Sequence, residues 1–385
     1  MTFSFTSKPP ILFGEGVVSE TGERAKAFGW ANPILIYDKG VKNAGITDKV
    51  TASLTAAGLS YSEFDGVLPD APDTVIEAAA QFARESGADG VIAIGGGSSL
   101  DIGKCVSILL TNPSPISSYW GPRDDLAPVP GTILIPTTAG TGSEVSDTAI
   151  ILNTELGVKV GVMGEHSKAK LALVDPELTF GLPPAFAAQA AIDAFTHGFE
   201  AYTGTGHNPI SDLYCEKTMA LVVGNLLPAL ADPGNTIAKT NLSLAATLGG
   251  ISFGDSMVHL GHNIGQNVAA LSHMAHGTSC ALGVLAIIEY LADAVPDRLR
   301  FVASLFGVTV SDGLNDAELG RELARRYKVF CQNAGVPTSL SEAGVPEDVL
   351  PQAAAAIEAD PILQLATPKR LDAKTALELL KKIYV

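Results

Sequence analysis

Short apolar runs, each followed at once by glycine, proline or charged residues, recur through the first part of the chain. Residues 33–37, 90–94 and 132–135 are such runs. Uninterrupted apolar runs of this length are typical of strands buried on both faces. Between them, residues 74–86 carry apolar side chains at helical spacing. This alternation predicts an α/β N-terminal domain with a doubly wound, mostly parallel sheet.

After residue 176 the pattern changes to long stretches of helical periodicity. Ala- and Leu-rich segments at 185–202, 211–227 and 237–248 are separated by glycine and proline. We therefore predict two domains, an α/β domain over residues 1–180 and an all-α domain over 181–385. A length of 385 residues suits two domains better than one core.

Charge and cysteine content limit the function classes. The chain has 25 Lys and Arg against 41 Asp and Glu, a net charge of −16, which disfavours binding to nucleic acid or to a membrane surface. Its four cysteines form no CxxC pair, which argues against a thiolate zinc site or a disulfide framework. We see no signal peptide, and the apolar stretch 283–295 is too short to span a bilayer. We expect a soluble cytoplasmic protein whose partner is a small molecule.

A glycine-rich loop follows the second apolar run. Gly95, Gly96, Gly97 and Ser98 stand between that run and a helix expected over 100–110, whose first turn would carry Asp101. Glycines let a backbone approach a diphosphate closely, and a helix N-terminus offers free N–H groups. The pattern favours phosphate binding over a turn that needs glycine only for its dihedral angles.

Two further features could belong to the same cofactor site. The loop 136–144, rich in Thr and Gly, follows another strand, and on its own it suits a polar connection equally well. Asp38 ends the first strand, where a carboxylate can bind an adenosine ribose and favour NAD over NADP, although an ordinary turn aspartate fits as well.

Histidines concentrate in the helical half. Asp193 and His197 lie one turn apart on one helix face, and Asp/His sets suit Fe(II), Zn(II) or Mn(II). His262 and His276 are 14 residues apart, about 21 Å on one straight helix, so they share a metal only if the chain turns back between them. Spacing alone does not decide which histidines join. His207 reads as a loop residue. The other candidates are His259 and His273.

These pieces, in this order, resemble the iron-containing (group III) alcohol dehydrogenases, which share the dehydroquinate synthase-like fold. The matching motifs run through most of the chain. They are Phe13-Gly-Glu-Gly16, Gly95–Ser98 with Asp101 and Lys104, Pro136–Glu144, Leu173–Leu178, Asp193–Tyr202, His262 and His276-Gly277.

The resemblance implies NAD and one divalent metal, Fe2+ or Zn2+. It implies metal ligands at Asp193, His197, His262 and His276, and catalytic roles for His262, His276 and Phe253, a pocket residue nine positions before His262. His259 is then a structural or neighbouring histidine. The implied cofactor contacts are Asp38, Gly95, Gly96, Gly97, Ser98, Asp101, Thr137, Thr138, Thr141 and Lys159. A homodimer or higher homo-oligomer is also implied.

The chain departs from the family pattern at two positions. Asp70 stands where many relatives have asparagine. Gln266 stands where many carry a histidine that relays the alcohol proton, and glutamine is no acid or base near neutral pH. A water chain, His259 or His273 takes that role, or the metal alone suffices.

The sequence therefore predicts a metal-dependent, NAD-linked oxidoreductase that interconverts a small alcohol or hydroxy acid with its aldehyde or ketone. Two alternatives lie close to this reading, a hydroxyacid–oxoacid transhydrogenase, which His259 and His262 suggest, and a 4-hydroxybutyrate dehydrogenase-like enzyme. More distant are a dehydroquinate synthase-like lyase, a metal-free maleylacetate reductase-like enzyme and a non-catalytic NAD-binding module. The substrate, the choice of iron or zinc, the subunit count and the physiological direction stay open.

Overall fold

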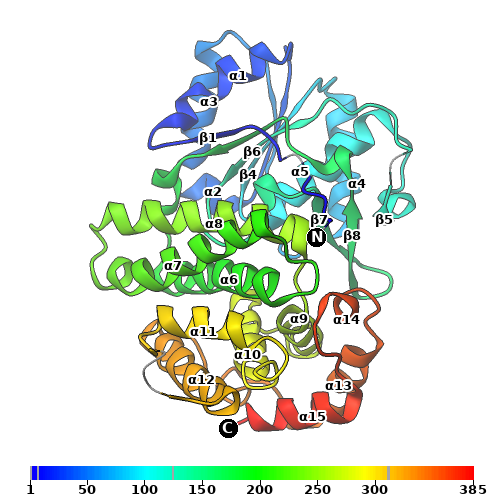
Figure 1. The fold of residues 1–385 in the computed structure, drawn as a ribbon. Coiled ribbons are helices and arrows are strands. Elements are labelled where there is room, and N and C mark those ends of the chain that lie inside the picture. Colours follow the sequence, from blue (N-terminus) through cyan, green and yellow to red (C-terminus); the bar gives the residue numbers. More distant parts are fainter. Residues whose placement is uncertain (1, 7, 124, 310–312) are drawn as a thin grey trace. The chain divides into compact units, whose positions relative to one another are not determined.

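The structure is a computed structural model that describes residues 2–6, 8–123, 125–309 and 313–385 (Figure 1). The chain divides into two compact units, Ser7–Gly181 and a second unit that joins Met1–Thr6 to Leu182–Val385. The backbone N–H of Thr6 donates to Asp255 Oδ1 at 2.7 Å, which fastens the N-terminal segment to the second unit. The predicted fold class, α/β followed by all-α, is confirmed. The domain limits 1–180 and 181–385 stay a prediction.

A six-stranded parallel sheet forms the centre of the first unit. Its strand order is β1-β9-β6-β4-β2-β3, and every neighbouring pair is parallel. The three predicted strands are the adjacent β2, β4 and β6. The bounds are β1 Ile11–Phe13, β2 Ile34–Tyr37, β3 Ser62–Phe64, β4 Val91–Gly95, β6 Thr132–Pro136 and β9 Leu171–Val174.

Alternate residues of each central strand enter different cores. In β2, Ile34 and Ile36 pack with α4 and α5, whereas Leu35 and Tyr37 pack with α1 and α3. Helices on both faces explain why these strands are almost wholly apolar instead of apolar at every second position. The helical bounds are η1 Val17–Glu20, α1 Thr21–Ala27, α2 Lys39–Asn43, α3 Ile46–Ala56, α4 Asp73–Glu85, α5 Gly97–Thr111, η2 Ile116–Tyr119, η3 Ser143–Val145, η4 Glu165–Ser167 and η5 Pro176–Thr179.

A small second sheet and a carboxylate complete this unit. The sheet has the order β5-β8-β7, with β7 (Thr148–Asn153) antiparallel to β8 (Val158–Met163) and β5 at Gly121–Pro122. Asp175, fully buried after β9, accepts hydrogen bonds from the backbone of Gly16 and Val18 at 3.1 Å each. Two of the family-like motifs therefore meet and hold the β1–η1 turn against the end of β9.

The second unit is helical in its described residues. α6, α7 and α8 pack against one another, and α6 also contacts α9 and α10. No described helix combines the length and apolar character that a membrane crossing needs. The bounds are α6 Pro184–Thr203, α7 Pro209–Ala231, α8 Thr236–Ser256, α9 Leu260–Ser272, α10 His276–Ile287, α11 Pro296–Leu305, α12 Asp316–Asn333, η7 Glu347–Val349, α13 Leu350–Ala359, α14 Leu363–Ala366 and α15 Ala373–Lys382.

Candidate active site

Helix α6 carries three polar side chains on one buried face. Asp193, His197 and Glu200 are spaced by four and three residues, which places them one above another along the helix. Their exposed fractions are 3%, 6% and 0%. Proline at the first helical position and a run of Ala and Phe favour the helix, so the polar triad is held on a rigid, apolar scaffold.

The chain turns back between His262 and His276. Helix α9 begins at Leu260 and ends at Ser272, and His273 adopts the left-handed conformation with φ 56°. After this turn α10 begins at His276 and packs against α9. His262 and His276 could share a metal only if the chain turned back between them, and this turn brings them onto two adjacent helices.

The four predicted metal residues converge on one carboxylate oxygen. Asp193 Oδ1 lies 3.7 Å from Nε2 of His197, 3.7 Å from Nε2 of His262 and 3.4 Å from Nε2 of His276. The imidazole rings of His197 and His262 are stacked with centroids 5.0 Å apart. Three helices, α6, α9 and α10, thus bring their donor atoms to one point.

The donor spacing fits a divalent metal. In a regular tetrahedron with metal–N and metal–O bonds of about 2.0–2.1 Å, neighbouring donors are about 3.3–3.4 Å apart. The three separations from Asp193 Oδ1 exceed that by at most a few tenths of an ångström. Imidazole and carboxylate are ligands that iron and zinc accept. These side chains therefore suit the divalent iron or zinc that the family resemblance implies.

Glu200 is a residue of this site whose role the sequence did not reveal. Its carboxylate accepts from the backbone N–H of His259 at 3.1 Å, of Gly261 at 2.5 Å and of His262 at 3.1 Å, and from Nδ1–H of the His262 ring. In the neutral ring this bond keeps the proton on Nδ1, so the lone pair of Nε2, which is directed at Asp193, is the one that can bind a metal. A carboxylate–histidine pair of this kind fixes both the tautomer and the ring orientation.

The electrostatics of the cluster follow from its burial and its mixed charges. Burial raises the pKa of Asp193, but His197 and His276 outweigh it and hold that pKa well below its usual range. Burial lowers the pKa of His197 to about 4. Nδ1 of His197 is buried and has no hydrogen-bond partner among the described residues. An ionised Asp193 beside a neutral His197 is the pairing that a cation binds.

The residues around the cluster differ in their access to it. Phe253 on α8 lies with its ring centroid 4.5 Å from that of His197, which suits the predicted apolar wall. His259 is fully buried, and its Nε2 lies 2.9 Å from Thr203 Oγ1. Its Nδ1 is 3.5 Å from Glu200 Oε1 without hydrogen-bond geometry. Gln266 is half-buried on α9, and His273 is exposed at the turn.

The glycine-rich loop lies beside the loop 136–144 in the first unit. A Cβ at Gly97 would come within 2.9 Å of Thr141 Cγ2, and one at Gly96 within 3.4 Å of Thr138 Cγ2. Gly95 has φ 148°, which favours glycine, and a Cβ there would meet Ser99 Oγ at 2.3 Å. These close approaches bring the two predicted cofactor loops together.

Asp38 sits at the end of the neighbouring strand. Its Oδ1 accepts from Val41 N at 3.0 Å and caps α2, and its Oδ2 lies 3.5 Å from Ser99 Oγ. Thr137 donates its backbone N–H to Gly95 O at 2.9 Å. The carboxyl ends of β2, β4 and β6 thus hold the predicted dinucleotide contacts at one edge of the sheet. The capping of α2 is by itself a sufficient structural reason for an aspartate at position 38.

The expected position of Asp101 was wrong. Helix α5 begins at Gly97, three residues before the expected start, so Asp101 lies in the second turn and not the first. Its Oδ1 accepts from Ser143 Oγ at 2.6 Å and faces Lys104 Nζ at 3.4 Å, and its Oδ2 accepts from Ile150 N at 3.0 Å. Oδ1 of Asp101 therefore holds the loop 136–144 on α5, and Oδ2 holds β7 on the same helix.

Lys159 has a protein partner. It lies on β8, and its Nζ forms an ion pair with Asp70 Oδ1 at 2.8 Å. Both side chains are partly exposed. Asp70 itself has φ 63°, a conformation that aspartate and asparagine tolerate better than most residues.

Comparison with known proteins shows one family along the whole chain. Residues 9–176 match the model described as iron-containing alcohol dehydrogenase, and residues 187–384 match the model described as Fe-containing alcohol dehydrogenase family, C-terminal. The sulfoacetaldehyde reductase of Bilophila wadsworthia (strain 3_1_6) is 30% identical over 357 residues, 92% of each chain. The chain belongs to the iron-containing alcohol dehydrogenase family.

Solved structures of family members agree. A 1,3-propanediol oxidoreductase is 28% identical with a TM-score of 0.95 over 100% of both chains. The sulfoacetaldehyde reductase from Bifidobacterium kashiwanohense in complex with NAD+ is 25% identical with a TM-score of 0.88, covering 100% of this chain and 99% of that one. The predicted family and enzyme class, a metal-containing alcohol dehydrogenase, are confirmed. The predicted cofactors, NAD and a divalent metal, agree with the family description and with the NAD+ complex of that relative.

One side chain beside Asp193, His262 and His276 was not among the predicted site residues. Asp193, His262, His276 and Cys280 each offer a donor atom within 4.8 Å of the other three, and His197 lies outside this set of four. The sequence was searched for cysteine pairs, and a single cysteine beside histidines does not form one. The available signal was its position four residues after His276, one helical turn further along α10.

Proposed function

We propose that the metal of this alcohol dehydrogenase is held by Asp193, His197, His262 and His276 and that the enzyme interconverts a small alcohol or hydroxy acid with its aldehyde or ketone. The observation that carries the proposal is the convergence of three histidine Nε2 atoms on Asp193 Oδ1, 3.4–3.7 Å away. In the reaction the alcohol and NAD+ give the aldehyde or ketone, NADH and a proton. Two relatives named for sulfoacetaldehyde and for 1,3-propanediol support a small alcohol or aldehyde as the substrate.

The side chains of the helical unit supply position and orientation. A divalent metal in this cluster would act as a Lewis acid that favours loss of the hydroxyl proton. Glu200 accepts a hydrogen bond from Nδ1–H of His262, which leaves the lone pair of Nε2 free to bind the metal. Phe253 covers the ring of His197 and keeps water from that side of the cluster. His262 and His276 act as ligands and not as proton carriers.

The first unit supplies the dinucleotide site in this proposal. Gly95, Gly96, Gly97 and Ser98 receive the pyrophosphate at the N-terminus of α5, where the helix dipole favours an anion. In this proposal Thr138 and Thr141 face it from the neighbouring loop, and Thr137, bonded through its backbone to Gly95, lies beside them. Asp38 binds the adenosine ribose, and Lys159 contributes a further contact.

The setting of the enzyme is part of the proposal. Four free, buried cysteines suit a reducing cytoplasm. The acidic chain, with a net charge of −16, suits a small-molecule substrate and no nucleic acid or membrane partner. We include a homodimer or higher homo-oligomer as the working form.

The test combines turnover with metal content. NADH formation is followed over short primary alcohols, diols and hydroxy acids, with chelated enzyme set against Fe(II)- and Zn(II)-loaded enzyme. His262→Ala should lose both bound metal and turnover, whereas His166→Ala, a half-buried histidine of the first unit, should keep both. Wild-type metal content in the His262→Ala variant would refute the ligand assignment. Turnover by chelated enzyme would refute the role of the metal.

A further inference from the structure

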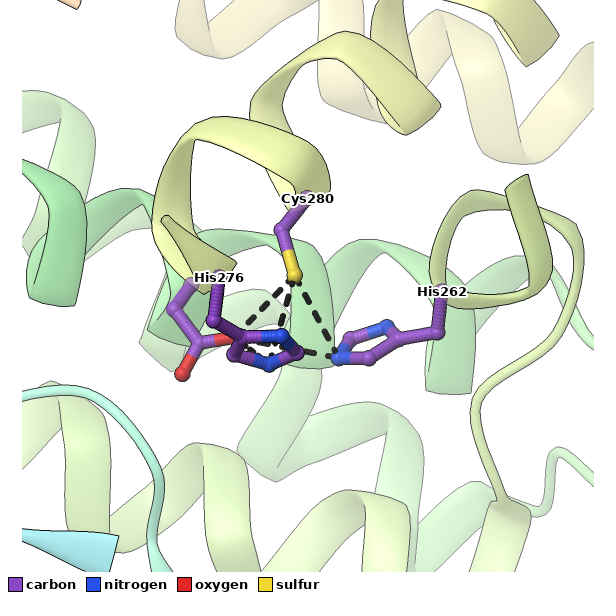
Figure 2. A group of neighbouring side chains, drawn as sticks. His262, His276 and Cys280 are labelled. Carbon is purple, nitrogen blue, oxygen red and sulfur yellow. Dashed lines mark hydrogen bonds and ion pairs between the residues drawn. The ribbon is translucent and has the colours of Figure 1, made fainter. Parts of the chain in front are cut away.

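Cys280 points into the metal cluster. Its Sγ lies 3.4 Å from Asp193 Oδ1, 3.7 Å from His262 Nε2 and 3.6 Å from His276 Nε2. Figure 2 shows Cys280 and His276 projecting from one helix toward His262 on another. The residue is fully buried, so its sulfur has no solvent as an alternative partner.

These separations match those of a metal ligand. With metal–S bonds of about 2.3 Å and metal–N bonds of about 2.0–2.1 Å, tetrahedral S···N separations come to about 3.5–3.6 Å. The two measured S···N distances are 3.6 and 3.7 Å. One donor atom from each of Asp193, His262, His276 and Cys280 also lies within 4.8 Å of the other three, which is a compact four-donor arrangement.

A plain alternative is a buried cysteine that packs as a small apolar side chain. Cys105 illustrates it, because this residue belongs to the apolar core of the first unit. Cys280 differs because the polar atoms of three side chains surround its sulfur at 3.4–3.7 Å. An apolar role does not account for such an environment.

We propose that Cys280 is a protein ligand of the metal. The inference rests on the proposed metal site and adds the sulfur of Cys280 to the donors of Asp193, His262 and His276, which lie close to it. On binding, the S–H bond breaks, a metal–sulfur bond forms, and the proton leaves to solvent. A thiolate is a soft ligand that favours zinc, so the site prefers Zn(II) over Fe(II) more strongly than nitrogen and oxygen donors alone would.

Cobalt(II) provides a direct test, because a cobalt–thiolate bond gives an intense charge-transfer absorption in the near ultraviolet. We expect this band in the metal-free enzyme reloaded with Co(II). Cys280→Ser and Cys280→Ala should lose the band, and both should show a lower ratio of zinc to iron affinity. Cys105→Ala, which removes a buried thiol away from the cluster, should keep the band.

The outcomes separate this inference from the proposed function. Stoichiometric cobalt without the band in the wild-type enzyme overturns the role of Cys280 and leaves the proposed metal site standing. No stoichiometric cobalt at all overturns both. X-ray absorption of zinc-loaded wild-type enzyme needs no variant: a sulfur neighbour at about 2.3 Å supports the inference. A shell of nitrogen and oxygen only overturns it, even if the Cys280 variants fail to fold.

Discussion

Replacing Glu200 by glutamine should weaken the metal site without touching a metal ligand. The carboxylate receives two hydrogen bonds on each oxygen, from His259 N and Gly261 N on Oε1 and from N and Nδ1 of His262 on Oε2. A glutamine keeps one oxygen and turns an NH2 group toward the remaining two donors. The ring of His262 then loses the partner that fixes its tautomer, or the first turn of α9 loses its cap.

The magnitude follows from this count of donors. A buried donor left without a partner costs about 1–3 kcal/mol, so two of them lower the free energy of unfolding by about 2–6 kcal/mol. Loss of a carboxylate partner behind a metal-binding histidine typically lowers metal affinity by about 10–100-fold. We therefore expect Glu200→Gln to show both effects, each measurable by itself.

Two assays separate the effects. Urea unfolding of the metal-free protein gives the stability loss, and chelator competition at low temperature, corrected for the folded fraction, gives the zinc affinity. Glu216→Gln is the matched control, because Glu216 accepts a single hydrogen bond from Tyr202 at 3.1 Å. Zinc binding by Glu200→Gln with wild-type affinity would show that Glu200 does not position His262.

Two further predictions concern the first unit and the surface. Gly97→Ala should raise the KM for NAD+ and leave metal content unchanged, because its Cβ would come within 2.9 Å of Thr141, whereas Gly181→Ala has open space; equal KM values in kinetic assays would contradict this. Hydrogen bonds from Arg325 and Arg326 lower the pKa of Glu322 to about 2. The ionised carboxylate therefore contributes stability that is present above pH 4.5 and is lost as the pH falls toward 2. Glu322→Gln should therefore unfold at a lower urea concentration than wild type at pH 7. The free energy of unfolding should fall by at most about 1 kcal/mol, because solvent screens these surface ion pairs, and the difference should be smaller at pH 3. A gap of constant size would refute the pKa assignment.

The sheet was predictable because burial on both faces leaves a strong pattern. The runs at 33–37, 90–94 and 132–135 became the adjacent strands β2, β4 and β6. The start of α5 was not predictable in the same way, since Gly97 and the two serines after it are poor or middling helix formers. Packing of the glycine loop against Thr138 and Thr141 outweighs that local preference.

The roles of Glu200 and Cys280 depend on partners that lie far away in the sequence. Glu200 stood within a recognised motif, but its hydrogen-bond donors come from residues 59 to 62 positions later. The sulfur of Cys280 contacts Asp193 and His262, which belong to other helices. Spacing along one helix predicts only pairs such as Asp193 and His197. A cluster drawn from three helices depends on how those helices cross.

Glycines at the helix crossings set the geometry of the cluster. A Cβ at Gly283 on α10 would lie 2.1 Å from the carbonyl oxygen of Gly261 on α9, and one at Gly277 would lie 2.4 Å from the carbonyl of Gln189 on α6. Gly261 and Gly277 directly adjoin His262 and His276, so each histidine is anchored where two helix backbones touch. Any side chain at these positions would separate the helices by more than the few tenths of an ångström that the donor spacing tolerates. The metal site therefore depends on residues that carry no donor atom, which is why no pattern of donors alone could define it.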